Sequence, residues 1–233
     1  MALYKILLTI IASTTILTIG YDIYEWRKAP PYDEGVAIDE WIPSPAVTIW
    51  LITVGVCLFL LATCYHVNIF DYSSPIEHKN VSFVTLKDFK GVKLPNRTLE
   101  GSKEFAYIVT TLFINRKPDE IVVKSHFHPS RSYVFNRLTA DRLLLDHELY
   151  HFHITEFCAR KMRKDLRELT SVPSDAEVSF VLDKTQREIS SLQSQYDYDT
   201  HHGYILKQQK FWKNKVDSLL FLYKEYEDTS IRF

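Results

Sequence analysis

The chain has 233 residues, of which 46% are hydrophobic and 24% charged, and these proportions exclude an intrinsically disordered protein. The net charge is −1 and the sequence pI is about 6.8, so there is no basic excess that would indicate a nucleic-acid partner. The three cysteines form no Cys-x-x-Cys pair and predict no disulfide framework. Any metal site must therefore be built from histidines and carboxylates.

Residues 1–70 are expected to form a membrane hairpin. Residues 41–65 carry no charge, and within them VTIWLITVGVCLFLLATCY is long enough to cross about 30 Å of hydrocarbon as a helix. Residues 6–21 are also uncharged but shorter and richer in threonine, as in the hydrophobic region of a signal peptide. No convincing cleavage site follows them, although cleavage remains an open alternative. We expect two spans in the lipid bilayer, at about 4–21 and 46–66.

The side of the membrane follows from the lysines and arginines near the spans. They are Lys5 before the first span, Arg27 and Lys28 in the loop, and Lys79, Lys87, Lys90 and Lys93 after the second. The positive-inside rule then puts both termini in the cytoplasm and predicts a multi-pass cell-membrane protein with its domain on the cytoplasmic side. An amino terminus on the outside would instead place the domain in the periplasm or outside the cell.

The rest of the chain is expected to be a linker followed by one domain. Residues 71–80 are polar with a Ser-Ser-Pro turn signal, which indicates a linker, and residues 81–233 are long enough for one buried core. Segments 105–114 and 120–127 are rich in Val, Ile, Thr, Tyr and Phe, and the Lys-Pro-Asp turn between them predicts a β-hairpin. A further strand is expected at 132–135.

Three helices are expected after these strands. The first starts with Thr139 as a candidate cap, where the hydrophobic period changes to about 3.6. Ser174 begins a capping box that opens a second helix running toward Gln195, and Thr200 can cap a third. The predicted fold class is α+β, a small antiparallel sheet packed against an active-site helix and two further helices.

The sequence His-Glu-Leu-Tyr-His at residues 147–151 carries the chemistry. On a helix, the i, i+4 spacing puts His147 and His151 on one face, so that both imidazoles can bind one metal ion. Glu148 lies beside them and can accept a proton from water during metal-assisted amide hydrolysis. The histidines share their stripe with Leu144 and Ile154, so they face the core, where an unpaired imidazole is costly.

A third ligand is expected from YDYDTHHG, residues 196–203, because catalytic zinc usually has three protein ligands and a water. Gly203 permits a close approach of another backbone, and a cap at Thr200 would hold His201 and His202 at a defined helix entrance. We assign His202 as the third ligand, with His201 as the alternative.

Neighbouring side chains of the same segment can support the reaction. Asp197 or Asp199 can orient a zinc-bound imidazole, and Tyr196 or Tyr198 can donate a hydrogen bond to an oxyanion. Tyr198 is our candidate catalytic tyrosine. Alternatively, the segment is a polar turn that joins two helices.

Other polar residues are expected to be structural. His126 and His128 alternate along a strand and form a weaker candidate metal pair, whereas His153 points away from the ligand face toward solvent or a structural hydrogen bond. Glu156 and Arg160 form an i, i+4 helix pair, and residues 160–167 are typical of a solvated helix face.

The residues HELYHFHITEFCARKMRKDL and YDYDTHHG resemble a bacterial family of unknown function described as predicted secreted zinc-dependent proteases. That family has a His-Glu-x-x-His helix and a later Tyr-Asp-x-x-Thr-x-His-Gly motif, and LKDFKG at residues 86–91 is similar to its domain entrance, so the resemblance covers most of residues 81–225. The resemblance implies a zincin-like domain with His147, His151 and His202 as metal ligands and Glu148 as the base. The family's description as secreted differs from the membrane hairpin and cytoplasmic domain expected for this chain.

Residues and resemblance together predict a membrane-anchored zinc metallopeptidase with one Zn²⁺ per chain and a peptide or protein substrate. The alternative is a non-catalytic binding or scaffold protein whose zinc is structural or whose site is degenerate. An open coordination position distinguishes the two, because structural zinc sites are closed by four protein ligands. A third possibility, membrane assembly through the two spans alone, predicts no metal.

Overall fold

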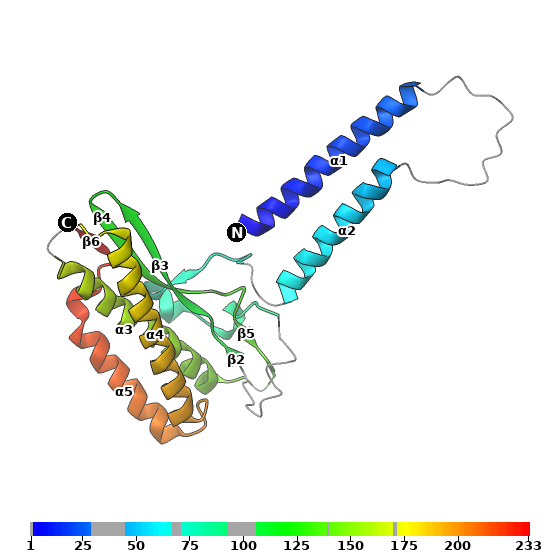
Figure 1. Cartoon of the computed structure of the whole chain (residues 1–233). Coiled ribbons are helices and arrows are strands. Elements are labelled where there is room, and N and C mark those ends of the chain that lie inside the picture. Colours follow the sequence, from blue (N-terminus) through cyan, green and yellow to red (C-terminus); the bar gives the residue numbers. More distant parts are fainter. Residues whose placement is uncertain (1, 29–44, 67–70, 93–105, 139, 170–171) are drawn as a thin grey trace. The chain divides into compact units, whose positions relative to one another are not determined.

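The structure is a computed structural model and describes residues 2–28, 45–66, 71–92, 106–138, 140–169 and 172–233 (Figure 1). The chain forms two compact units, Met1–Phe70 and Asp71–Phe233. The division follows composition, since the first unit holds the long uncharged segments and the second holds the mixed sequence of an ordinary core and surface. Each unit is described separately.

The first unit consists of two helices, α1 (Ala2–Lys28) and α2 (Pro45–His66). They contact each other, and Trp50 Nε1 of α2 donates a hydrogen bond to Thr15 Oγ1 of α1 at 2.8 Å. Among the described residues, the single stretch long and apolar enough to cross a membrane is Pro45–Thr63, and 6% of it is buried. The second expected span therefore corresponds to an apolar helix, whereas α1 is longer than expected and falls short of the same criterion.

The sheet of the second unit is antiparallel and is organised around one strand. β3 (Thr110–Lys117) pairs with one side of β4 (Glu120–Phe127), in the hairpin that the sequence predicts. β1 (Ile76–Glu77) and the carboxy-terminal β6 (Ser230–Arg232) pair with the two ends of β4 on its other side. β6 is not among the strands that the sequence predicts.

A separate two-stranded sheet joins β2 (Ala106–Tyr107) to β5 (Tyr133–Val134). β5 corresponds to the strand expected at 132–135. Residues 93–105, which precede β2, lie outside the described part of the chain. The expected α+β class is confirmed at this level of description.

The expected linker at residues 71–80 is wrong. Asp71 accepts a hydrogen bond from the His128 ring, with 2.8 Å between Asp71 Oδ2 and His128 Nδ1, and β1 lies in the sheet. A short 3₁₀ helix, His78–Phe83, follows at once. Composition suggests a linker because the segment is polar. It does not show that a polar group such as Asp71 has a partner, His128, elsewhere in the domain.

Three helices complete the unit: α3 (Arg142–Arg167), α4 (Asp175–Thr200) and α5 (Leu206–Leu222). Asp141, not Thr139, caps α3 by accepting a hydrogen bond from the Leu144 backbone at 2.9 Å; Thr139 lies outside the described residues. The capping box at Ser174 is confirmed.

The end of α4 differs from the expectation. α4 continues past Gln195, and Thr200 is its last residue instead of the cap of α5, because its hydroxyl donates to the Tyr196 carbonyl at 2.6 Å inside α4. α5 begins only at Leu206. This shift moves Asp197 from a loop onto a helix face.

The core lies around α3, which contacts β3, β4, α4 and α5. Figure 1 shows α4 and α5 as neighbouring long helices beside it. On one side, Phe89, Phe127 and Phe152 are fully buried, and on another Tyr196 and Trp212 pack with Ile154 of α3. Burying each such side chain contributes about 1.5–3 kcal/mol relative to exposing it, so α3 is held on several sides.

Candidate metal centre

α3 places the two histidines of the His-Glu-x-x-His sequence one turn apart on a buried face. The ring centroids of His147 and His151 are 5.1 Å apart, with the ring planes nearly perpendicular at 88°. Both side chains are buried, and the predicted stripe continues through Ile154, Cys158 and Met162 into the core. The helix therefore holds both imidazoles in defined positions before any metal binds.

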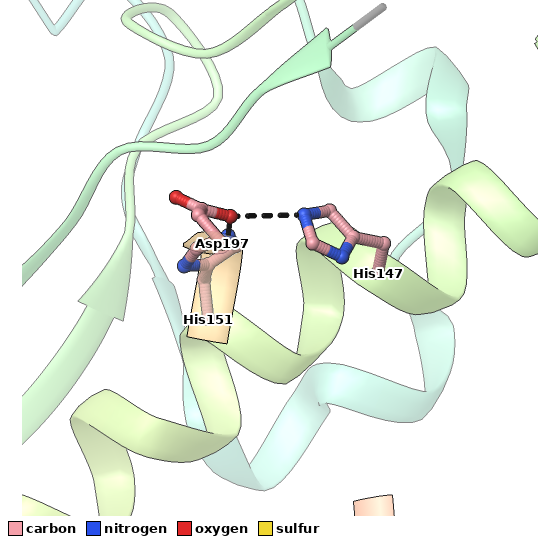
Figure 2. Close-up of side chains that lie close together, drawn as sticks. All are labelled: His147, His151 and Asp197. Atoms are coloured by element: carbon pink, nitrogen blue, oxygen red, sulfur yellow. Dashed lines mark hydrogen bonds and ion pairs between the residues drawn. The ribbon is translucent and has the colours of Figure 1, made fainter. Parts of the chain in front are cut away.

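α4 supplies a carboxylate opposite these rings. Asp197 Oδ1 lies 3.1 Å from His147 Nε2 and 2.9 Å from His151 Nε2, as the dashed lines in Figure 2 show. Burial acts to raise the pKa of Asp197, but the hydrogen bonds from the two imidazoles outweigh it and hold the pKa below its usual range. Asp197 is therefore a carboxylate that faces two imidazole nitrogens.

Two neighbours orient the His147 ring. His147 Nδ1 lies 3.2 Å from Gln209 Oε1 of α5, and the Tyr196 ring stacks on His147 with centroids 4.8 Å apart. A metal-binding histidine typically donates its other ring N–H to an oxygen acceptor. With Nδ1–H donating to Gln209, a metal ion between the two groups would take the place of the hydrogen bond between His147 Nε2 and Asp197. Gln209 Nε2 itself is buried without a hydrogen-bond partner.

The donor set fits a divalent metal ion. Ligand atoms of His147, His151 and Asp197 all lie within 4.8 Å of one another. Among the described residues, this is the group of histidine, cysteine or carboxylate side chains that could hold a metal ion. Two imidazole nitrogens and one carboxylate oxygen are ligands that zinc accepts, with a fourth position left for water or substrate.

A cavity of about 100 Å³ opens at these donors. Glu148, which is buried, lies on its wall together with Leu144, Gln193 and His202. β2 and the residue after it form the facing wall through Tyr107 and Ile108. The expected base therefore shares a cavity with the three converging donors.

His202, the expected third ligand, lies at the edge of this group and not within it. Its Nδ1 is 3.7 Å from Asp197 Oδ1, and about a third of its side chain is exposed. Asp197, which we expected only to orient a ligand, occupies the facing position because α4 continues through it. The sequence holds one signal for this position of Asp197. Gln193 and Asp197 are four residues apart, so a helix that continues through both places them on one face.

The backbone after α4 is left-handed at three successive residues, His201, His202 and Gly203, with φ of 49°, 52° and 86°. Non-glycine residues seldom adopt this conformation, and such residues often lie at functional sites. A Cβ on Gly203 would lie 3.2–3.3 Å from atoms of the His147 side chain. The glycine therefore permits close approach to the His147 side chain instead of to a backbone, and the turn brings His202 back to the cavity.

Tyr198, the expected catalytic tyrosine, does not reach the cavity. Its side chain is 82% exposed, because it is one residue from Asp197 and so about 100° further around α4. Tyr196 is fully buried, and its hydroxyl donates to the His147 carbonyl at 3.4 Å. Burial raises the pKa of Tyr196. Neither tyrosine lines the metal cavity.

The other histidines make structural contacts. His128 lies between Asp71 and Thr111, with its Nε2 2.7 Å from Thr111 Oγ1, and His126 stacks on Phe113. His153 forms a hydrogen bond with His78 of 2.9 Å between His153 Nδ1 and His78 Nε2, so its expected structural role is confirmed.

The expectation of a solvated helix face at residues 160–167 is wrong for two of its arginines. Arg160 and Arg163 are buried, and Glu156 bonds to both, with its Oε1 3.1 Å from Arg160 Nε and 2.9 Å from Arg163 Nη1. Burial acts to raise the pKa of Glu156, but the charge and hydrogen bond of Arg163, together with smaller contributions that include the Ser125 hydrogen bond, outweigh it and lower the pKa. The pair is thus part of a buried ionic cluster, because Arg163 also bonds to the carbonyls of Val123 and Tyr226.

Among known proteins, no family model, no curated sequence and no solved structure matches this chain.

Proposed function

We propose that residues 71–233 form a zinc-dependent peptidase held at a membrane by the helices that precede them. The observation that carries the proposal is the convergence of His147, His151 and Asp197 at a cavity that Glu148 also lines. Two imidazoles, a carboxylate and an adjacent acid are the groups that metal-assisted amide hydrolysis uses.

In this proposal each residue has a separate role. His147, His151 and Asp197 would hold zinc, and Gln209 keeps the His147 ring in the required orientation. Zinc bound there would supply Lewis acidity toward the scissile carbonyl and a water molecule. Glu148 takes the proton from that water and delivers it to the departing amine nitrogen. Tyr198 has no part in this scheme because its side chain points to solvent.

The resemblance in motif supports the same function. Tyr196, Asp197, Thr200, His202 and Gly203 are the residues that match the Tyr-Asp-x-x-Thr-x-His-Gly pattern. Each has a defined place around His147 or its partners: a stacked ring, a carboxylate, a helix-terminal hydrogen bond, a cavity wall and a close approach. We propose on this basis that the chain is related to the family of unknown function described above as predicted secreted zinc-dependent proteases.

Membrane attachment rests on α2. Pro45–Thr63 has the length and apolar composition of a span, and its contact with α1 supports a hairpin. The distribution of lysine and arginine favours a multi-pass protein with its domain in the cytoplasm.

The test uses the full chain, purified in detergent and loaded with zinc. We expect one zinc per chain by elemental analysis and cleavage of unstructured peptides. Glu148→Gln should lower kcat by at least about 100-fold without loss of zinc, because it removes only the proton acceptor. Glu168→Gln, an exposed change just after the end of the same helix, is the matched control and should leave kcat unchanged. Equal rates for Glu148→Gln and the parent would refute the mechanism.

A second candidate is a structural zinc site, and the position of His202 favours it. A ligand nitrogen 3.7 Å from Asp197 Oδ1 needs only a small movement to become a fourth protein ligand. Cobalt substitution distinguishes the two proposals: a small hydroxamate should change the visible spectrum of an open site and leave that of a closed, four-ligand site unchanged.

A further inference from the structure

A second hollow adjoins the cavity at the candidate metal ligands, near the first residues of α3 and α5. Its volume is about 380 Å³, and Leu144, His147 and His202 line both hollows. The remaining wall comes from the first turn of α3, through Leu143, and from the chain entering α5, through Gly203, Tyr204 and Leu206. The two hollows are therefore neighbours that share the candidate ligand His147 and the side chains beside it as a common wall.

The wall of this second hollow is mostly apolar, and much of it faces solvent. Leu143, Tyr204 and Leu206 are 56%, 55% and 58% exposed although they lie next to one another around the hollow. Single exposed apolar residues are ordinary, but a cluster of them around a concave surface indicates a binding site. Covering these side chains with an apolar group would be favourable.

Asp141, the charged residue that lines the second hollow, already accepts a hydrogen bond as the cap of α3. Asp141 Oδ1 accepts the hydrogen bond from the Leu144 backbone at 2.9 Å as the cap of α3. Its negative charge at the rim disfavours an acidic side chain in the hollow. The metal cavity, at about 100 Å³, is smaller than the usual range for ligand pockets, whereas about 380 Å³ lies inside it.

We propose that this second hollow binds a bulky apolar side chain of a peptide substrate, of the size of leucine or phenylalanine, next to the bond that is cleaved. This rests on the proposed peptidase function and adds a substrate class to it. Because His147 lines both hollows, a side chain held in the second hollow would place the neighbouring peptide bond beside the candidate ligands. Leu206 and Leu143 then become specificity-determining residues.

The first test measures cleavage of a peptide library by the full chain in detergent, with each position near the cut varied and sites identified by mass spectrometry. We expect leucine, phenylalanine and methionine to be enriched at one position beside the cut. Leu206→Glu should lower kcat/KM for such peptides by about tenfold or more and shift the preference toward lysine or arginine at that position.

The substitution is chosen so that folding is retained. Leu206 is the first residue of α5, where a carboxylate interacts favourably with the helix dipole. Leu222→Glu is the matched control, because Leu222 is also a leucine that is more than half exposed and lies at the other end of the same helix. We expect it to keep the cleavage preference of the parent.

The second test measures binding without turnover, with a fluorescently labelled peptide added to Glu148→Gln. A leucine-containing peptide should bind more tightly than its glycine analogue, and Leu206→Glu in the same background should remove the difference. If the parent cleaves peptides with no apolar preference, the second hollow is not a substrate site while the peptidase proposal survives. If the parent cleaves nothing, the peptidase proposal fails, and equal binding of the two peptides then refutes the hollow as well.

Discussion

The two halves of α3 both bury polar side chains, yet they do so in opposite ways. In the amino-terminal half, His147 and His151 turn their Nε2 atoms toward Asp197 at the wall of a cavity. In the carboxy-terminal half, Glu156 is enclosed by Arg160 and Arg163. The first group consists of candidate metal ligands that line a cavity of about 100 Å³, and the second of opposite charges that pair with one another. Burial of polar groups by itself therefore does not distinguish a reactive site from a structural one; the remaining space and the kind of partner do.

The largest effect is expected from breaking the ionic cluster. Glu156→Ala leaves Arg163 buried and without its carboxylate, which should lower the free energy of unfolding by about 3–5 kcal/mol. Thermal unfolding of the full chain in detergent, followed by near-UV circular dichroism, measures it. The control is Glu168→Ala, which removes an exposed pair with Lys164 and should cost less than about 1 kcal/mol. Equal losses from the two changes would contradict the assignment of Glu156 to a stabilising cluster.

A substitution facing the amino-terminal half of α3 should lower the affinity for zinc instead of the free energy of unfolding. Asp197→Asn removes the charge of a proposed ligand, and we expect zinc to bind at least about 100-fold more weakly. Losing a residue that only orients a metal ligand already costs about 10–100-fold in metal affinity. Competition with a chromophoric chelator measures the affinity. Asp199→Asn is the matched control, because that carboxylate accepts from Trp212 Nε1 at 2.9 Å instead of facing the histidines.

The same experiment decides between Asp197 and the sequence-based choice of His202. If Asp197→Asn binds zinc as the parent does while His202→Ala loses it, the originally expected ligand set is correct. We expect the reverse, with a smaller loss for His202→Ala.

A smaller effect is expected from pH at His78, beside the ionic cluster. Burial lowers the pKa of His78 from 6.5 to about 4. Below pH 6.5 the unfolded chain takes up a proton that the folded chain takes up only near pH 4, so stability is complete above pH 6.5 and falls as the pH drops toward 4. His78 should contribute about 1–2 kcal/mol to the difference in unfolding free energy between pH 7 and pH 5. Unfolding of His78→Gln at both pH values should show a correspondingly smaller difference, and an undiminished one would contradict the role of His78.

Much of the fold was predictable because its signals are local. The β3–β4 hairpin follows from two β-rich segments and a turn between them, and the box at Ser174 opens α4 as expected. The prediction of a linker at residues 71–80 failed because polar composition does not show where the hydrogen-bonding partners of a segment lie. Asp71 and β1 find theirs in residues 126–128, far along the chain. The prediction of a solvated helix face at residues 160–167 failed for the same reason. The carbonyls that accept hydrogen bonds from Arg163 lie in β4 and in the chain after α5.

The sequence by itself determined that His147, Glu148 and His151 lie together, because the helical repeat brings residues four apart onto one face regardless of the rest of the molecule. Only the tertiary structure decided which residue faces them. That choice depends on where α4 ends and how it packs on α3, through the burial of Tyr196 and its stacking on His147. These contacts join residues about fifty positions apart, and no local pattern encodes their geometry. Hence the pair on α3 could be assigned from spacing alone, whereas Asp197 in place of His202 required the packed helices.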